Sequence, residues 1–212
     1  MKNVLNAGFW SGILAFSFTI LYGIVQLLQV ARVIPYPYDE ILIYSVSLGI
    51  VIPFIIEILA LHYITTPLKK FWTHAAIIFT SMYAVFVTSN YVVQLATVIP
   101  MKLNGYGQEV KILEQTPHSL FWDFDALGYI FMGIAMLFAV PALGKSRQQK
   151  YARALLLANG LVTPLITFVY FYPVYSEKLL ILGYPWAITA PLAMLTLAFV
   201  FRKKLSAENK PA

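Results

Sequence analysis

Six long apolar segments follow one another along this chain, separated by short polar connections. They are Phe9–Val30, Ile41–Ile64, Phe71–Ile99, Leu120–Leu143, Tyr151–Phe171 and Leu179–Phe201. Each has about 20 residues or more, the length that an α-helix needs to cross the hydrocarbon core of a bilayer. The pattern therefore predicts an all-α fold, a bundle of six transmembrane helices that forms a single membrane domain over residues 1–212.

The basic residues fall mainly on alternate sides of these segments. Eleven of the 15 Lys and Arg residues lie on the side that carries both termini. They are Lys2, Lys69, Lys70, Lys145, Arg147, Lys150, Arg153, Arg202, Lys203, Lys204 and Lys210. Because cytoplasmic loops carry an excess of Lys and Arg, we expect a multi-pass protein of the plasma (cytoplasmic) membrane with both termini in the cytoplasm.

The amino-acid composition limits the kinds of molecule that this chain can be expected to bind. The chain is 60% hydrophobic and 11% charged, well below the charge content of a soluble domain. Its net charge of +6 comes from basic residues at helix ends, which form no continuous patch. We therefore expect contacts with lipid headgroups of the bilayer and no nucleic acid as a partner. The absence of Cys excludes disulfides and thiolate chemistry, and the sequence does not address the oligomeric state.

The second and fifth apolar segments share a local pattern. Gly49-Ile-Val-Ile-Pro53 in the second resembles Gly160-Leu-Val-Thr-Pro164 in the fifth. Two three-helix halves of opposite orientation would form an inverted repeat, an arrangement found in transporters. Chance similarity between apolar helices is the alternative, because Gly and Pro are frequent in membrane helices.

Polar residues recur at helical spacing inside several apolar segments, mostly in the half nearer the outer face. The candidates for a ligand site are Gln26, Gln29, Asn90, Gln94, Asp125 and Tyr129. Polar side chains within a bilayer usually face the bundle interior or a water-filled cavity, so these predict a vestibule open to the outer face. For Asn90 and Gln94 a second interpretation stays open, hydrogen bonding between helices that stabilises packing by about 1 kcal/mol each.

Glu57 is the only carboxylic acid well inside a predicted span, on the cytoplasmic side of the midplane. Asn159, also on the inner side, is a candidate partner, and the two together are a candidate proton or cation site. The alternative is a permanently neutral Glu57, since desolvation favours the protonated acid.

No catalytic residue, metal ligand set or cofactor motif is identified. The three His residues do not form a usual zinc site, although His118, Asp123 and Asp125 could in principle form an outer hydrolytic centre. The leading hypothesis is binding or transport of a small molecule, ion or lipid through the vestibule. The second is a non-enzymatic membrane subunit or sensor whose polar stripes serve packing and partner contacts, and the third is a membrane-embedded hydrolase.

Overall fold

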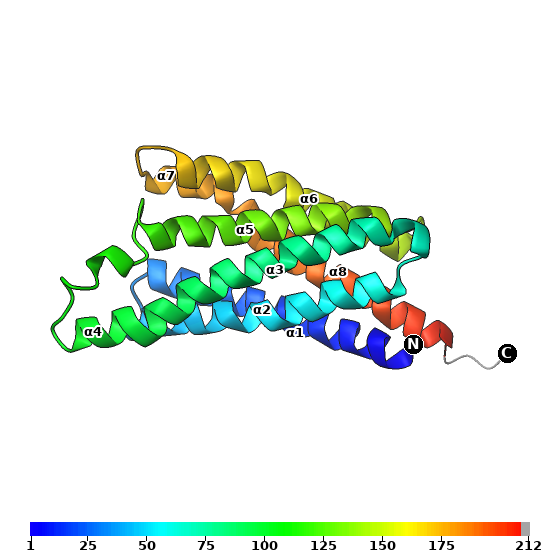
Figure 1. Ribbon diagram of the computed structural model, residues 1–212, viewed down its shortest axis with the longest axis horizontal. Coiled ribbons are helices and arrows are strands. Elements are labelled where there is room, and N and C mark those ends of the chain that lie inside the picture. The colour runs from blue at the N-terminus through cyan, green and yellow to red at the C-terminus, as the bar shows by residue number, and fades with distance from the viewer. Residues whose placement is uncertain (209–212) are drawn as a thin grey trace.

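The computed structural model describes residues 1–208. This part of the chain forms eight α-helices joined by short turns and loops, and it contains no strand. The helices are α1 (Lys2–Val30), α2 (Tyr38–Ile64), α3 (Lys70–Val93), α4 (Ile99–Leu103), α5 (Leu120–Ala139), α6 (Arg147–Phe171), α7 (Glu177–Leu180) and α8 (Pro185–Glu208) (Figure 1). A π-helical turn, Gln94–Val98, joins α3 to α4. The predicted all-α fold is confirmed for the described residues.

Six helical segments are long and apolar enough to cross a membrane, with α3, the π-helical turn and α4 counted as one segment. Large apolar side chains on their outer faces stay exposed in mid-helix, for example Ile52 (62%), Val85 (63%) and Leu161 (63%). Monomeric soluble proteins rarely expose so much apolar surface to water, whereas the lipid chains of a membrane would cover it. The chain is therefore compatible with a multi-pass membrane protein.

The six long helices form a closed ring in chain order. Each packs against its neighbours in sequence, and α8 closes the ring by packing against α1. Both described ends of the chain lie at one end of the bundle, which we call the terminal end (Figure 1). The opposite end, which we call the loop end, carries the connections 31–37, 104–119 and 172–184.

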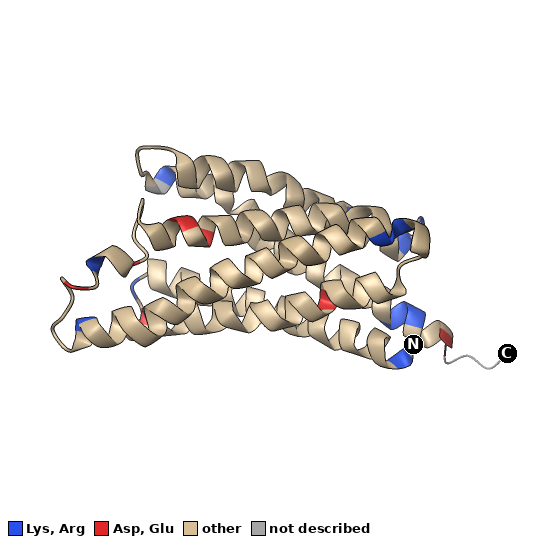
Figure 2. Cartoon of the chain, viewed as in Figure 1, with Lys and Arg blue, Asp and Glu red and all other residues tan. Residues whose placement is uncertain are grey.

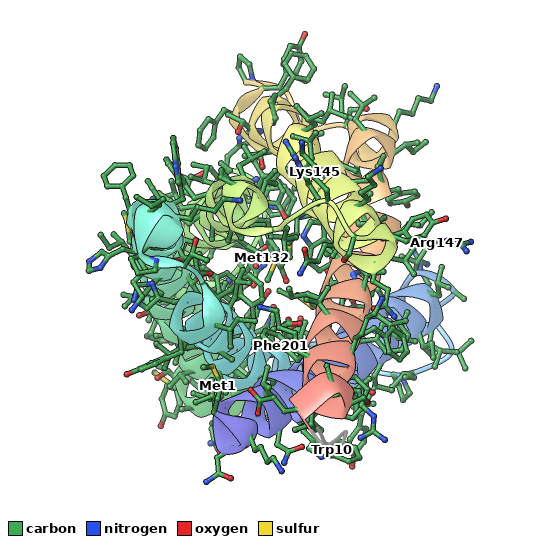
Figure 3. The ribbon with its side chains drawn as sticks, turned by 90° about the vertical axis from the view of Figure 1, so that its right-hand side faces the viewer. Met1, Trp10, Met132, Lys145, Arg147 and Phe201 are labelled. Carbon is green, nitrogen blue, oxygen red and sulfur yellow. The ribbon has the colours of Figure 1, made fainter. Side chains whose placement is uncertain are left out.

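Large side chains fill the inside of the ring through its middle and its terminal half. The largest fully buried ones include Phe54, Tyr83, Met132, Met194 and Phe201. Figure 3, a view onto the terminal end, shows Met132 and Phe201 inside the ring, whereas Trp10 and Arg147 lie on its outside. The ring is thus a packed bundle over most of its length.

Glycines allow several helices to approach closely, and two of them lie at the contacts of α1. A Cβ added at Gly12 on α1 would collide with the Glu57 carboxyl group on α2 and with Ala198 on α8. A Cβ at Gly49 on α2 would collide with the ring of Phe18 on α1. These positions let α1 lie directly against its two neighbours in the ring.

The helix ends differ from the apolar segments that predict them. α1 begins at Lys2 and α6 at Arg147, earlier than the apolar segments, because polar residues continue a helix beyond the hydrocarbon core. The last helix begins at Pro185, and residues 179–183 lie in α7 and a short 3-10 turn. Pro is well placed at a first helical position, since its missing N–H would have no partner there. The inverted repeat stays a prediction.

Candidate ligand-binding cavity

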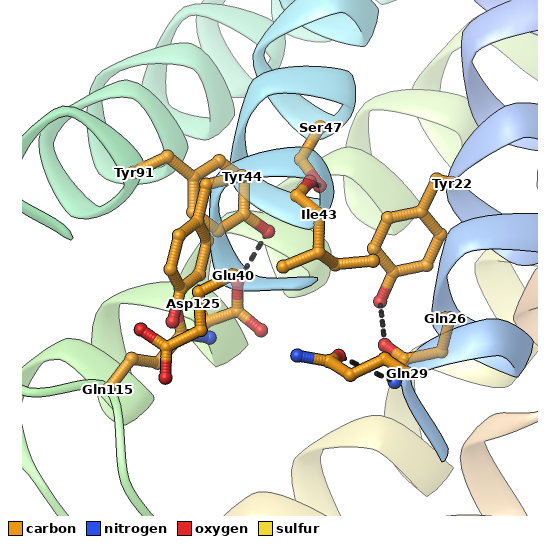
Figure 4. Close-up of a pocket in the computed structure, with 10 residues that line it drawn as sticks. All are labelled: Tyr22, Gln26, Gln29, Glu40, Ile43, Tyr44, Ser47, Tyr91, Gln115 and Asp125. Atoms are coloured by element: carbon orange, nitrogen blue, oxygen red, sulfur yellow. Dashed lines mark hydrogen bonds between the residues drawn. The ribbon is translucent and has the colours of Figure 1, made fainter. Parts of the chain in front are cut away.

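A cavity of about 210 Å³ opens inside the ring at the loop end (Figure 4). Ten residues line it, and nine of them are polar or carry a polar group. They are Tyr22, Gln26, Gln29, Glu40, Ile43, Tyr44, Ser47, Tyr91, Gln115 and Asp125. They come from α1, α2, α3, α5 and the loop before α5, so the chain must be folded before the cavity exists.

Asp125 holds the most elaborate hydrogen-bond arrangement at the cavity. The Tyr91 hydroxyl donates to its Oδ1 at 2.7 Å and the Tyr170 hydroxyl donates to its Oδ2 at 2.8 Å. Asn90 Nδ2 lies 3.5 Å from Oδ1, and the hydroxyls of Tyr91 and Tyr129 lie 3.0 Å apart. The carboxyl group is therefore fixed by neutral donors, and no basic side chain among residues 1–208 forms a salt bridge with it.

Local sequence explains why α5 presents Asp125 here. The Ser119 side chain caps the helix, accepting a hydrogen bond from the N–H of Trp122 at 3.2 Å. With the helix begun at Leu120, Asp125 points into the ring and is 5% exposed, whereas Asp123 lies in the first turn and is half-buried. A first-turn position suits an acid because of the helix dipole.

A second set of hydrogen bonds runs along the opposite wall, on α1. The Tyr22 hydroxyl donates to Gln26 Oε1 at 3.2 Å, and Gln26 Nε2 donates to Gln29 Oε1 at 3.3 Å. Gln29 Nε2 then donates to Asp39 Oδ2 on α2 at 3.3 Å. Figure 4 shows the first two of these bonds. These bonds use the Tyr22 hydroxyl and one N–H of each glutamine, and they join α1 to the start of α2.

A short loop segment closes part of the cavity. Residues 111–115, which we call the lid segment, are tied to α3 by Gln94, whose Nε2 donates to the Leu113 carbonyl at 2.7 Å and whose Oε1 accepts from the Gln115 N–H at 3.2 Å. Asn90 Nδ2 donates to Gln115 Oε1 at 2.9 Å. The Lys102 ammonium lies 3.6 Å from the Glu114 carboxylate, which ties the same segment to α4.

The π-helical turn at Gln94–Val98 lies where α3 meets the lid segment. Pro100 lacks the N–H that an α-helix would use at this point, and a π turn inserts one extra residue into a helix. Gln94, the first residue of the turn, is 1% exposed and makes its bonds to the lid segment from there.

Aromatic contacts hold the rings of the cavity wall in place. The Tyr44 and Tyr91 rings lie 5.4 Å apart, and the Tyr22 ring packs edge-on against Trp186 at 5.7 Å. Trp186 also packs edge-on against Tyr129 at 4.7 Å. Aromatic pairs at such distances are stabilising, so the wall is largely preformed.

The structure places five of the six sequence candidates at or beside one cavity. Gln26, Gln29 and Asp125 line the cavity. Asn90 and Tyr129 lie just behind its wall, where they bond to lining residues. Gln94 instead binds the lid segment, which favours the packing interpretation for that residue.

Seven of the ten lining residues were not among the six sequence candidates, including Glu40, Tyr91 and Gln115. Glu40 lies in the first turn of α2 and Gln115 in a loop, where polar residues are ordinary. Tyr91 directly follows Asn90, so its position in an apolar span was the one available signal. It was missed because membrane tyrosines are common at the lipid interface.

The predicted pair of Glu57 and Asn159 is not formed. Asn159 Nδ2 donates to the sulfur of Met136 at 3.0 Å, and its Oδ1 accepts from Thr189 at 2.9 Å. Both oxygens of Glu57 are buried without a hydrogen-bond partner among the described residues. The physical reason is the ring order, because α2 and α6 lie across the ring from each other.

The remaining polar candidates do not converge. His118 is exposed, and among residues 1–208 it makes no hydrogen bond to Asp123 or Asp125. The described part of the chain holds no group of three or more His, Cys, Asp or Glu residues that could hold a metal ion. No family model, curated protein or solved structure matches this chain.

Proposed function

We propose that this chain is a multi-pass membrane protein that binds a small polar solute in the cavity at the loop end, with that end on the outer side of the membrane. The observation that carries this proposal is the concentration of polar groups around one cavity. Nine of the ten lining residues carry a polar group, in a bundle whose interior is otherwise filled mainly by apolar side chains. Polar groups are costly inside a membrane, and they commonly mark substrate or ion pathways.

The size of the cavity and its lid support a solute rather than a whole lipid. A volume of about 210 Å³ is below that of drug-sized pockets and would admit a compact molecule. The lid segment rests on hydrogen bonds from Asn90 and Gln94 and on one salt bridge, so its release would open the cavity without unfolding a helix. Transport would require the packed terminal half to open as well, so binding is the first step to test.

The test uses two matched serines on α2. Ser47 is buried and lines the cavity, whereas Ser45 is exposed on the same helix. Ser47→Leu places extra methyl groups in the cavity, and Ser45→Leu places them on the outer face. Purified wild type and both variants are screened for thermal stabilisation by 10 mM choline, glycine, acetate and glucose, because a bound ligand raises stability by mass action.

We expect at least one solute to stabilise wild type and Ser45→Leu but not Ser47→Leu. Stabilisation of all three proteins alike, or of none by any solute, would contradict the proposal. Melting curves without solute show that Ser47→Leu is folded. Uptake of the stabilising solute into proteoliposomes then separates a transporter from a sensor, and a stoichiometric partner that co-purifies would favour the membrane-subunit alternative.

A further inference from the structure

The charges around the cavity are of one sign. Two lining residues are acidic, Glu40 and Asp125, and none is Lys, Arg or His. The basic group that acts on the Glu40 carboxyl is Lys102, whose ammonium lies 3.6 Å from Glu114 and 5.3 Å from the centre of the Tyr36 ring. A ligand inside the cavity would therefore meet negative charge.

Several donors of the wall are already engaged. The Tyr91 hydroxyl donates to Asp125, the Tyr22 hydroxyl to Gln26, and one N–H each of Gln26 and Gln29 to Gln29 and Asp39. Acceptors remain: the Glu40 carboxylate accepts no hydrogen bond within residues 1–208, and it has room for about four. Two buried oxygens next to the wall, Asp39 Oδ1 and Asn90 Oδ1, also lack a donor. The cavity therefore offers a ligand free acceptors and negative charge, and none of its lining residues is basic.

Three aromatic rings also form part of the cavity wall. Tyr22, Tyr44 and Tyr91 all line the cavity, and their neighbours hold them in place. The face of an aromatic ring attracts a cation, and aromatic walls recognise quaternary ammonium groups in particular. A bare metal ion would gain little from them, since hard cations prefer oxygen ligands.

The charge distribution of the whole chain points the same way. Seven of its nine acidic residues belong to the loop end or its connections, namely Asp39, Glu40, Glu109, Glu114, Asp123, Asp125 and Glu177. Figure 2 shows acidic positions mainly at the loop end, where four basic residues also lie, and most basic positions at the terminal end. Such a field raises the local concentration of cations at the mouth of the cavity.

We propose that the solute of this cavity is a small organic cation with an ammonium group, for which Asp125 and Glu40 are the countercharges. This inference rests on the proposed function, since it names the chemical class of the solute. The proposed ligand is a free cation and not a phosphocholine headgroup, because the lining has no basic residue that could bind the phosphate.

The test compares choline with 3,3-dimethyl-1-butanol, which has the same shape but no charge. Binding to the purified protein in detergent is measured by titration calorimetry. We expect choline to bind and its uncharged analogue to bind at least tenfold more weakly. Glycerophosphocholine and NaCl, each tested as a competitor of choline, distinguish a lipid headgroup or an inorganic cation as the true ligand.

Two variants link the binding to the cavity. Asp125→Asn keeps the shape but removes the charge, and we expect it to weaken choline binding by tenfold or more. Asp123→Asn makes the same change two residues away, outside the cavity lining, and we expect it to leave the affinity unchanged. Melting curves check that both variants fold. Should Asp125→Asn fail to fold, Glu40→Gln replaces it in the same comparison.

Each outcome has one meaning. Equal binding of choline and its uncharged analogue, unchanged affinity in the folded Asp125→Asn or Glu40→Gln variant, or stronger binding of glycerophosphocholine or Na⁺ would overturn the ammonium proposal. Binding of acetate, glycine or glucose without choline would overturn it too, yet leave the proposed solute-binding function in place. No binding of any of these solutes would remove both.

Discussion

The Gln94 side chain accepts a hydrogen bond from the backbone N–H of Gln115 at 3.2 Å, across the boundary between a membrane helix and a loop. Its amide also donates to the Leu113 carbonyl at 2.7 Å, so one side chain satisfies backbone groups on both sides of Glu114. The lid segment, a 3-10 turn and the two residues after it, thereby gains a fixed position beside the cavity.

Gln94→Ala is expected to release the lid segment. The change leaves the Gln115 N–H and the Leu113 carbonyl without these partners, which costs about 1–3 kcal/mol where such groups remain buried. Hydrogen exchange should rise in residues 111–116 and stay unchanged in α5. Gln108→Ala, at an exposed position of the same loop, is the control. Equal exchange in both variants would show that the lid segment is held by other contacts.

Tyr170→Phe is expected to destabilise the protein by about 1–3 kcal/mol, because a buried acceptor loses its donor. The variant removes the 2.8 Å hydrogen bond to Asp125 but keeps the ring contact with Trp122 at 4.5 Å. Tyr172→Phe, which alters an exposed ring two residues on, should melt like wild type. Identical melting temperatures for the two variants would mean that the Tyr170 hydroxyl does not support Asp125.

Gly12→Ala is expected to lower the melting temperature markedly. The added Cβ would collide with the Glu57 carboxyl group and with Ala198, and forced overpacking costs about 1–3 kcal/mol. Gly23→Ala on the same helix is the control, since nothing lies within 4 Å of its Cβ position. A Gly12→Ala protein as stable as Gly23→Ala would show that α1 is not packed as closely as described.

Glu57→Met is expected to raise the melting temperature. The acid is buried with both oxygens unpartnered, and an apolar side chain of similar size removes a penalty of about 1–3 kcal/mol.

Glu57→Gln keeps the shape but cannot release a proton. If Glu57 is a proton or cation site, Glu57→Gln should fold normally and lose any proton-dependent uptake. Unchanged uptake and pH profile would leave Glu57 with a structural role alone.

The orientation prediction is tested on this Cys-free chain by single cysteines. A membrane-impermeant thiol reagent on intact cells should label His118→Cys, at the loop end, and should not label Lys145→Cys until the cells are opened. Labelling of Lys145→Cys on intact cells would reverse the orientation and place the cavity on the cytoplasmic side.

The membrane helices could be predicted from the sequence because apolar length is a local property. The cavity could be predicted in part for a related reason: a glutamine or an aspartate in an apolar segment stands out, and helical spacing places Gln26 and Gln29 on one face. The side of the ring that each helix faces is a different matter. It depends on ring order, which is why depth alone paired Glu57 with Asn159.

Some residues that line the cavity could not be predicted from the sequence, for another reason. Gln115 reaches the cavity only because the lid segment folds back onto α3, a contact between residues 21 positions apart. Glu40 becomes a cavity residue because α2 begins beside the end of α1. Contacts of this kind belong to the tertiary structure, and no spacing along the chain records them.

The separation of Asp125 from Glu57 has an electrical consequence. At 1.5 Å per residue, Asp125 lies about 8 Å from the loop-end start of α5, and Glu57 lies about 10 Å from the terminal-end limit of α2. The apolar middle of the ring lies between them. A full crossing of 100 mV is worth about 2.3 kcal/mol per charge, so a cation resting on Asp125 would sense only a small part of the membrane potential. Binding of this cation should therefore be almost independent of voltage. If the protein transports the cation, any voltage dependence of transport would arise deeper in the membrane, where the cation passes Glu57.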